Sequence, residues 1–177
     1  MKHELDVPGF RVVQGDLLAD PARILVCPVN CKPGVMGKGL AKAFAGLFPG
    51  LIDRHRMACE DGTLDVGRPR MVKATFHSEW DAAKWGGPKV RDIILFPTKL
   101  DWRNDARYDW IFAGLAALYP ILGRAYEESE EVNIAVPALG CGLGRLEWPV
   151  IANMIRCWSA GLPERYSVIL YAPKEVR

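Results

Sequence analysis

The fold is decided by Val26-Cys-Pro-Val-Asn30-Cys-Lys-Pro-Gly34-Val-Met-Gly37-Lys38-Gly39-Leu-Ala41, an apolar run that stops at an asparagine, passes through three glycines and enters a helical pattern. This order predicts a strand, a loop and the first turn of a helix. Glycine allows positive φ angles and close approach to a ligand, and the N-terminus of a helix presents unpaired N–H groups and a positive dipole end. The stretch therefore predicts a loop that binds an anion.

A second glycine loop has the sequence Pro137-Ala-Leu-Gly140-Cys-Gly142-Leu-Gly144-Arg145-Leu-Glu-Trp148-Pro149, after a strand-like run and before a helix. Neither loop has the G-x-x-x-x-G-K-[ST] order of a triphosphate P-loop or the G-x-G-x-x-G order of a dinucleotide fold. One such loop also serves a plain connection between a strand and a helix. Two of them, each at such a junction, favour a diphosphate held from both sides.

Length and composition indicate one ordinary globular domain. The chain has 177 residues, of which half are hydrophobic and a quarter are charged, so a single core over residues 1–177 is expected. No apolar run approaches the ~20 residues that span a bilayer, and the N-terminus has acidic residues where a secretory signal has an apolar segment. We therefore expect a cytoplasmic protein without a membrane partner.

The cysteines predict neither a disulfide framework nor a metal site. Their number is odd and none forms a C-x-x-C pair, which favours buried free thiols in a reducing compartment. The five are Cys27, Cys31, Cys59, Cys141 and Cys157. With the three histidines they give no recognisable zinc spacing, so we predict no metal.

The charge distribution is more informative than the net charge of +2. Lysines and arginines crowd residues 68–107 and alternate there with Trp80, Trp85 and Trp102. Cations and aromatic rings together hold phosphates and stack on bases. A solvated face above tryptophans of the core fits the same pattern, and the residues leave both interpretations open.

Strand and helix patterns alternate along the chain. Strands are predicted at 10–14, 24–29, 70–75, 90–96, 132–136 and 166–171, and helices from about residue 40 to 48, at 51–60, around 111–122 and at 149–159. Pro120 is expected to kink or cut the third helix, and residues 76–89 form a long polar and aromatic excursion. The alternation predicts a mixed, mostly parallel sheet covered on both faces.

In such sheets ligands bind at the carboxyl ends of the strands. Both glycine loops follow strand ends, and so do Thr98 and Lys99. Three segments that are distant in the sequence are therefore expected to share one rim of the sheet.

These motifs resemble those of a known family. Gly15-Asp16-Leu17, the strand that ends in Asn30, the two glycine loops and Phe96-Pro97-Thr98-Lys99 occur in the order found in macrodomains, and the resemblance covers about residues 10–171. It implies a three-layer α/β/α fold. The chain looks similar to the branch with the terminal ADP-ribose protein glycohydrolase and the DNA ADP-ribosyl glycohydrolase antitoxin, DarG, and Trp102-Arg103 after the Phe-Pro-Thr-Lys motif is closer to the antitoxin.

The resemblance implies the residues that bind ADP-ribose. Asp16, with Leu17 beside it, would bind the adenine, and Asn30 would bind the distal ribose, although each also fits a plain turn. The first loop would flank the distal ribose and the phosphates, and backbone N–H groups of the second loop would bind the diphosphate. The remaining implied residues are Val35, Met36, Gly37, Lys38, Gly39, Thr98, Leu139, Gly140, Cys141, Gly142, Leu143 and Gly144.

Lys99 carries the implied chemistry. In the resembling glycohydrolases a lysine here attacks the anomeric carbon of the distal ribose, and water then releases the covalent intermediate. The amine must be unprotonated, so desolvation or a nearby cation, for which Arg103 and Lys38 are candidates, should lower its pKa, while a bound diphosphate raises it. The alternative is a lysine that only pairs with phosphate.

Gly144 departs from the protein-directed relatives, which carry an aspartate at this position. The DNA-directed relatives resemble this chain in having glycine, so the resemblance implies ADP-ribose on a nucleobase rather than on a protein carboxylate. Asp101 and Glu147 are the sequence candidates for a general acid or base.

We therefore expect an ADP-ribosylhydrolase that reverses the ADP-ribosylation of DNA as an antitoxin. The expected substrate is ADP-ribosylated single-stranded DNA and the expected partner is a DNA ADP-ribosyltransferase toxin, with a monomeric chain and no cofactor. Trp102 and Arg103, with Trp80 and Trp85 of the excursion, would contact DNA near the ribose. Alternatives are a module that binds ADP-ribose without hydrolysis, a phosphatase of ADP-ribose 1″-phosphate, and an excursion that is only a surface hairpin.

Overall fold

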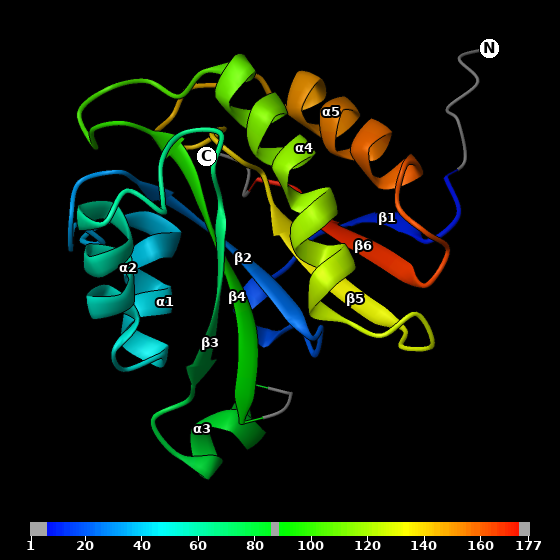
Figure 1. Cartoon of the computed structure of the whole chain (residues 1–177), viewed down its shortest axis with the longest axis horizontal. Helices are drawn as coiled ribbons and strands as arrows, with labels where there is room; N and C mark the ends of the chain where they lie inside the picture. Colours follow the sequence, from blue (N-terminus) through cyan, green and yellow to red (C-terminus); the bar gives the residue numbers. More distant parts are fainter. Residues whose placement is uncertain (1–6, 86–88, 174–177) are drawn as a thin grey trace.

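The computed structural model describes residues 7–85 and 89–173, with the side chain of Trp80 excepted. Within them, six strands form one sheet in the order β1-β6-β5-β2-β4-β3 (Figure 1). All neighbouring strands are parallel except β3, which runs antiparallel to β4. The strands are β1 (Phe10–Val13), β2 (Ile24–Asn30), β3 (Arg70–Thr75), β4 (Val90–Lys99), β5 (Val132–Pro137) and β6 (Tyr166–Tyr171). The predicted mixed, mostly parallel sheet is confirmed.

Helices cover both faces of this sheet. One face carries α1 (Gly39–Leu47) and α2 (Leu51–Glu60), and the other carries α4 (Tyr108–Ala125) and α5 (Trp148–Ala160), as Figure 1 shows. A short 3-10 helix, η1 (Leu17–Ala19), follows β1, and α3 (Glu79–Lys84) lies between β3 and β4. The three-layer α/β/α arrangement is therefore confirmed, whereas η1 and α3 are too short to give a periodic sequence signal.

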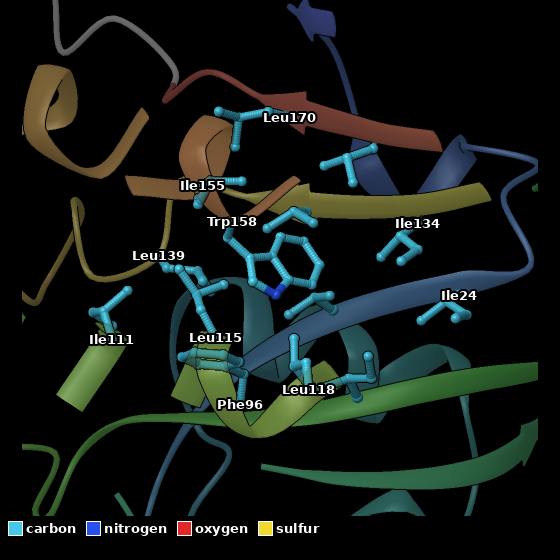
Figure 2. Packing of buried hydrophobic residues seen from close by; sticks show 14 of the residues in the cluster. Ile24, Phe96, Ile111, Leu115, Leu118, Ile134, Leu139, Ile155, Trp158 and Leu170 are labelled. Carbon is cyan, nitrogen blue, oxygen red and sulfur yellow. The ribbon is translucent and has the colours of Figure 1, made fainter. Parts of the chain in front are cut away.

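The alternation along β2 explains why the sheet has a core on each side. Ile24 and Val26 face the cluster under α4 and α5, while Leu25 and Cys27 face the cluster under α1 and α2. Successive strand residues point to opposite faces, so a strand buried on both sides reads as a continuous apolar run. Figure 2 shows Trp158 of α5 packed into the first cluster. Burial of each large apolar side chain contributes about 1.5–3 kcal/mol.

Pro120 does not cut its helix. The helix α4 continues from Tyr108 to Ala125 with the proline inside it. Leu118 and Leu122 on either side are both buried against the sheet, and this packing outweighs the hydrogen bond that proline cannot make. A kink or a cut was expected at Pro120, and the expectation of a cut was wrong.

The excursion at residues 76–89 lies far from the predicted site. It precedes β4, whose 10 residues span about 30 Å at roughly 3.3 Å per residue, and Lys99 is at the other end of that strand (Figure 1). Trp85 packs partly against the core beneath α1 and α2, and the side chain of Trp80 is outside the described residues. Trp85 is therefore not part of a shelf near the ribose, contrary to the prediction, and the prediction for the side chain of Trp80 falls outside the described residues.

The structure also describes the cysteine thiols, the residue types that ligate metals and the length and polarity of the helices. All five cysteines are free thiols; Cys27 is buried, whereas Cys157 on α5 is exposed, so burial was wrongly predicted for that thiol. In the described ranges no cluster of three histidine, cysteine, aspartate or glutamate residues has a geometry that would hold a metal ion. None of the helices seen there is long and apolar enough to cross a bilayer.

Candidate active site

The predicted segments meet at the carboxyl edge of the parallel strands. The first glycine loop follows β2, residues 100–107 follow β4, and the second glycine loop follows β5. Backbone hydrogen bonds join them: Cys31 N–H donates to the carbonyls of Lys99 at 3.1 Å and Leu100 at 3.2 Å, and Ala106 N–H donates to the Gly144 carbonyl at 3.0 Å. The structure thus brings the three segments together on one rim, as the topology predicted.

Lys99 lies at the junction of these segments. Its side chain is almost buried, with 8% of the residue exposed, and Nζ donates a hydrogen bond to the carbonyl oxygen of Leu143 at 2.5 Å. The amine of the predicted nucleophile is therefore held against the second glycine loop. In this position it faces the loop that is expected to bind the diphosphate.

The surroundings of Lys99 lower its pKa. Burial is the largest cause that lowers its pKa below the usual value; the Asp105 carboxylate opposes the shift and the Arg145 guanidinium adds to it. Arg103 and Lys38, which the sequence suggested, are not the cations responsible. Arg145 and Asp105 also lie close to each other, with Arg145 Nε 3.6 Å from Asp105 Oδ1.

Backbone groups of the second glycine loop are arranged to bind an anion. The N–H groups of Gly142, Leu143 and Gly144 have no hydrogen-bond acceptor within the described residues, whereas Cys141 N–H donates to Ala138 O at 3.1 Å. Consecutive unpaired N–H groups form a concavity that binds phosphate. Cys141 is therefore not a free donor here, contrary to the prediction for it.

Gly144 is held where no side chain fits. A Cβ atom built on it would lie 2.5 Å from the Gly140 oxygen and 2.8 Å from the Ala106 Cβ. Gly140, at φ +74°, is also crowded, because its Cβ would meet Leu146 at 2.8 Å. Arg145 follows with φ 62°, a positive angle found in no other non-glycine residue of the described ranges. The turn is thus tight and partly strained.

The first glycine loop offers a similar set of donors. Gly37, Lys38 and Gly39, at the start of α1, have N–H groups without an acceptor among the residues described here. Gly37 has open space around the position of a Cβ, and Gly39 has φ +57°. The loop is therefore open to a ligand that carries phosphate or ribose oxygens.

Asn30 closes the first loop. Its Nδ2 donates to Val35 O at 2.9 Å and its Oδ1 accepts from Lys32 N–H at 2.8 Å. The alternative role as a turn residue is therefore present in the structure. The amide keeps one further N–H and one lone pair, so its role in binding ribose stays a prediction.

His55 contacts the backbone of Asn30, and the sequence did not indicate this residue as part of the site. Its Nε2 lies 2.8 Å from the backbone oxygen of Asn30, and it is fully buried. The signal was present in the chain, because Leu51, His55 and Ala58 follow helical spacing and all three are buried on α2.

Asp16 is the polar side chain predicted for the adenine end of the site. Asp16 is exposed and accepts a hydrogen bond from Leu18 N–H at 3.0 Å, so it caps η1 and leaves its other oxygen unoccupied. Leu17 beside it is buried in the core, as are Met36 and Leu139. These three residues can reach a ligand through their backbone atoms, whereas Val35 is only half-buried.

Trp102 is an exposed aromatic residue in the segment that follows β4. Its ring is stacked by two cations, with Arg103 Cζ 4.7 Å and Lys38 Nζ 5.6 Å from the ring centroid, and 45% of the residue is exposed. A contact between a cation and an aromatic face contributes about 0.5–1 kcal/mol at an exposed site. The arrangement leaves a positively charged aromatic surface at the rim.

The carboxylates differ in their access to Lys99. Asp101 accepts from Arg103 N–H at 3.0 Å and pairs with Lys32, and the hydrogen bond from that N–H is the largest cause that lowers its pKa. Glu147 is the N-cap residue of α5, and its N–H donates to Tyr108 Oη at 3.0 Å. Asp105, which the sequence reasoning did not select, is the carboxylate whose charge acts on Lys99.

Known proteins are similar to this chain in sequence and in fold. No family model matches the chain. A DNA ADP-ribosyl glycohydrolase of Mycobacterium tuberculosis is 35% identical over 90% of this chain and 41% of its own length, so the chain spans less than half of that relative.

Two solved structures are similar over nearly the whole chain. The macrodomain of Mycobacterium tuberculosis DarG has 31% identity and a TM-score of 0.76, and the match covers 93% of this chain and 98% of that one. Thermosipho africanus DarTG in complex with ADP-ribose has 32% identity and a TM-score of 0.79 over 96% of this chain and 43% of that one. With this fold and its two glycine loops, the chain belongs to the macrodomains, in the group of the DarG macrodomains.

Proposed function

We propose that the chain hydrolyses the glycosidic bond between ADP-ribose and a nucleobase of single-stranded DNA. The observation that carries this proposal is the Lys99 amine, almost buried beside the second glycine loop with its pKa lowered. The similarity to a DNA ADP-ribosyl glycohydrolase and to a DarTG structure with ADP-ribose supports it. ADP-ribose would lie along the rim, with its diphosphate between the two loops.

In the proposed reaction the Lys99 lone pair forms a bond to the anomeric carbon of the distal ribose. The bond from that carbon to the base nitrogen breaks, and the base leaves with the electron pair and takes a proton from water. A second water then displaces the lysine amine and gives up a proton to the hydroxide that the first water left, which releases ADP-ribose and restores the neutral lysine. The buried position of Nζ keeps the nucleophile desolvated and oriented.

The test uses oligonucleotides that carry ADP-ribose on thymidine or on guanosine. Release of ADP-ribose from either substrate supports the proposal. Parallel assays use ADP-ribose linked to protein carboxylates and ADP-ribose 1″-phosphate. Tight binding of ADP-ribose with no release from any substrate would select a binding module instead, and release of phosphate alone would select a phosphatase.

Two substitutions should shift the pH dependence of the reaction in opposite directions. The rate should rise with pH as the Lys99 ammonium loses its proton. Arg145→Ala removes a cation that disfavours the ammonium form, so the pKa of Lys99 rises and the rate profile moves to higher pH. Asp105→Asn removes a carboxylate that favours the ammonium form. The pKa of Lys99 therefore falls and the rate profile moves to lower pH. Single-turnover rates across pH measure both, and shifts in the same direction would contradict the assignment.

Trp102 should contribute to binding of DNA and not of free ADP-ribose. Stacking of one base on an aromatic side chain contributes about 1–3 kcal/mol, so Trp102→Ala should weaken the binding of an ADP-ribosylated oligonucleotide about tenfold or more. Arg103→Ala should reduce the salt dependence of the same binding. Val90→Ala, an exposed apolar change at the other end of β4, is the control. Equal losses for free ADP-ribose would show that Trp102 serves the pocket and not the DNA.

The same proposal names the partners. A hydrolase of this kind acts on the product of a DNA ADP-ribosyltransferase, so the partner is such a toxin, which the chain would neutralise as an antitoxin. We propose a monomer that works in the cytoplasm. Rescue of cells that express a DNA ADP-ribosyltransferase tests this role, and failure of an active hydrolase to rescue them would oppose it.

A further inference from the structure

His55 is an imidazole placed where an apolar side chain would be expected. It lies on the face of α2 that packs against the sheet, together with Leu51 and Ala58, and none of its surface is exposed. Burial of a polar ring is costly unless its nitrogens are hydrogen-bonded. A packing role alone therefore does not account for histidine at this position.

One ring nitrogen has a specific partner. Nε2 lies 2.8 Å from the backbone oxygen of Asn30, and because a carbonyl oxygen only accepts, Nε2 carries the proton. Nδ1 is buried and has no hydrogen-bond partner among the described residues. Cys59, one turn along α2, has its Sγ 3.5 Å from Nε2. Burial lowers the pKa of His55 below its usual value, although the hydrogen bond to Asn30 acts in the opposite direction.

The carbonyl that His55 binds belongs to an irregular point of the sheet. Val29 pairs with Pro97 but Asn30 pairs with Lys99, so Thr98 is an extra residue in β4. A register shift of this kind leaves backbone groups unpaired and redirects side chains, and such shifts are common next to active sites. This one lies between the residue predicted to bind the ribose and the predicted nucleophile.

The displaced backbone groups find substitute partners. The Thr98 hydroxyl donates to Val29 O at 3.4 Å, and Cys31 N–H donates to Lys99 O at 3.1 Å and to Leu100 O at 3.2 Å. The Asn30 oxygen receives the His55 Nε2–H. The imidazole is therefore a side chain from outside the two strands that secures the shifted register.

We propose that His55 is a positioning residue for the hydrolysis, which acts by holding the Asn30 carbonyl at the register shift between β2 and β4. This role rests on the proposed function for its effect on catalysis. By fixing Asn30, the hydrogen bond fixes the first glycine loop on one side and, through Cys31, the end of β4 that carries Lys99 on the other. A small displacement of a nucleophile costs as much as a hundredfold in rate.

The test compares two amides at position 55. The amide nitrogen of His55→Gln reaches the position of Nε2, whereas that of His55→Asn is one methylene shorter and lies near the position of Nδ1. We expect His55→Gln to keep kcat within a few fold of the unmodified chain. His55→Asn should lower kcat about tenfold or more, with a smaller change in KM. Equal rates for the two variants would overturn the proposal.

A second measurement needs no substrate. Hydrogen exchange of the Cys31 amide, which bridges the register shift, should be faster in His55→Asn than in the unmodified chain and nearly unchanged in His55→Gln. If the chain hydrolyses no DNA substrate but this difference is present, the proposed function fails and the hold on the register shift stands. If exchange is equal in both variants, the inference about His55 fails even when the chain is active.

Leu51→Val controls for a merely structural effect. Leu51 is fully buried on the same helix, and its shortening lowers stability without touching the Asn30 carbonyl. We expect a lower melting temperature and an unchanged kcat below that temperature. A loss of kcat equal to that of His55→Asn would show that loosening α2 suffices and would overturn the specific role.

Discussion

Replacement of Lys99 by alanine is expected to lower the rate of ADP-ribose release from DNA by at least about a thousandfold, because loss of a covalent nucleophile removes the reaction path itself. The binding of free ADP-ribose should change only a few fold. The backbone donors of both loops remain in place, and the Lys99 amine is directed to the Leu143 carbonyl. Single-turnover kinetics measure the rate, and calorimetry measures the binding.

Two further variants separate nucleophilic attack from charge. Lys99→Arg keeps the positive charge but not an amine that deprotonates near neutral pH, so it should be as inactive as Lys99→Ala. Lys73→Ala, which removes a cation that pairs with Asp92 far from the rim, should leave the rate unchanged. An active Lys99→Arg variant would show that Lys99 only pairs with phosphate, which is the alternative that the sequence left open.

Gly144→Ala is expected to disrupt the second glycine loop. Its Cβ would lie 2.5 Å from the Gly140 oxygen and 2.9 Å from the Gly140 Cα, so the backbone must move, at a cost of about 1–3 kcal/mol for overpacking. The movement displaces the unpaired N–H groups and the Leu143 carbonyl that holds Lys99. We expect weaker ADP-ribose binding by about tenfold or more and a lower melting temperature, measured by calorimetry and by thermal unfolding.

The same crowding predicts the result of Gly144→Asp. This change introduces the carboxylate that the resemblance in sequence implies for protein-directed relatives. We expect loss of binding and no activity on protein-linked ADP-ribose, since this backbone has no room for the side chain. Gly142→Ala is the matched control for stability, because nothing lies within 4 Å of its Cβ position. A Gly144→Asp variant that is stable and acts on protein-linked ADP-ribose would refute the steric argument.

Much of the fold was predictable because its signals are local. The helix at Leu51–Glu60 and the strands at Arg70–Thr75 and Tyr166–Tyr171 have the predicted bounds. The strand β4 was predicted to end at Phe96 but continues to Lys99, because Phe-Pro-Thr-Lys contains a proline and a lysine that local propensity reads as a turn. Pro120 misled the prediction for the same reason, since the packing on either side of it is not a local property.

The site was predictable in its segments and less so in its contacts. Lys99, Asn30 and the glycine loops lie on one rim, as strand order and topology indicated. The cation that lowers the pKa of Lys99 is Arg145 and not Arg103 or Lys38. Charge in a sequence shows which residues are ionised, but not which of them face one another.

The sequence by itself determined the alternation of strands and helices, the two glycine loops at strand ends and the lysine of the Phe-Pro-Thr-Lys motif, which lies at the end of β4. Each of these is set by a few consecutive residues. Only the tertiary structure decided that Lys99 donates to Leu143, 44 residues away, and that His55 donates to Asn30, 25 residues away. It also decided that Gly144 has no room for a side chain. Such contacts depend on how separate elements pack against one another. The hydrophobic pattern and the local propensities of a sequence do not show which residues from different elements come into contact.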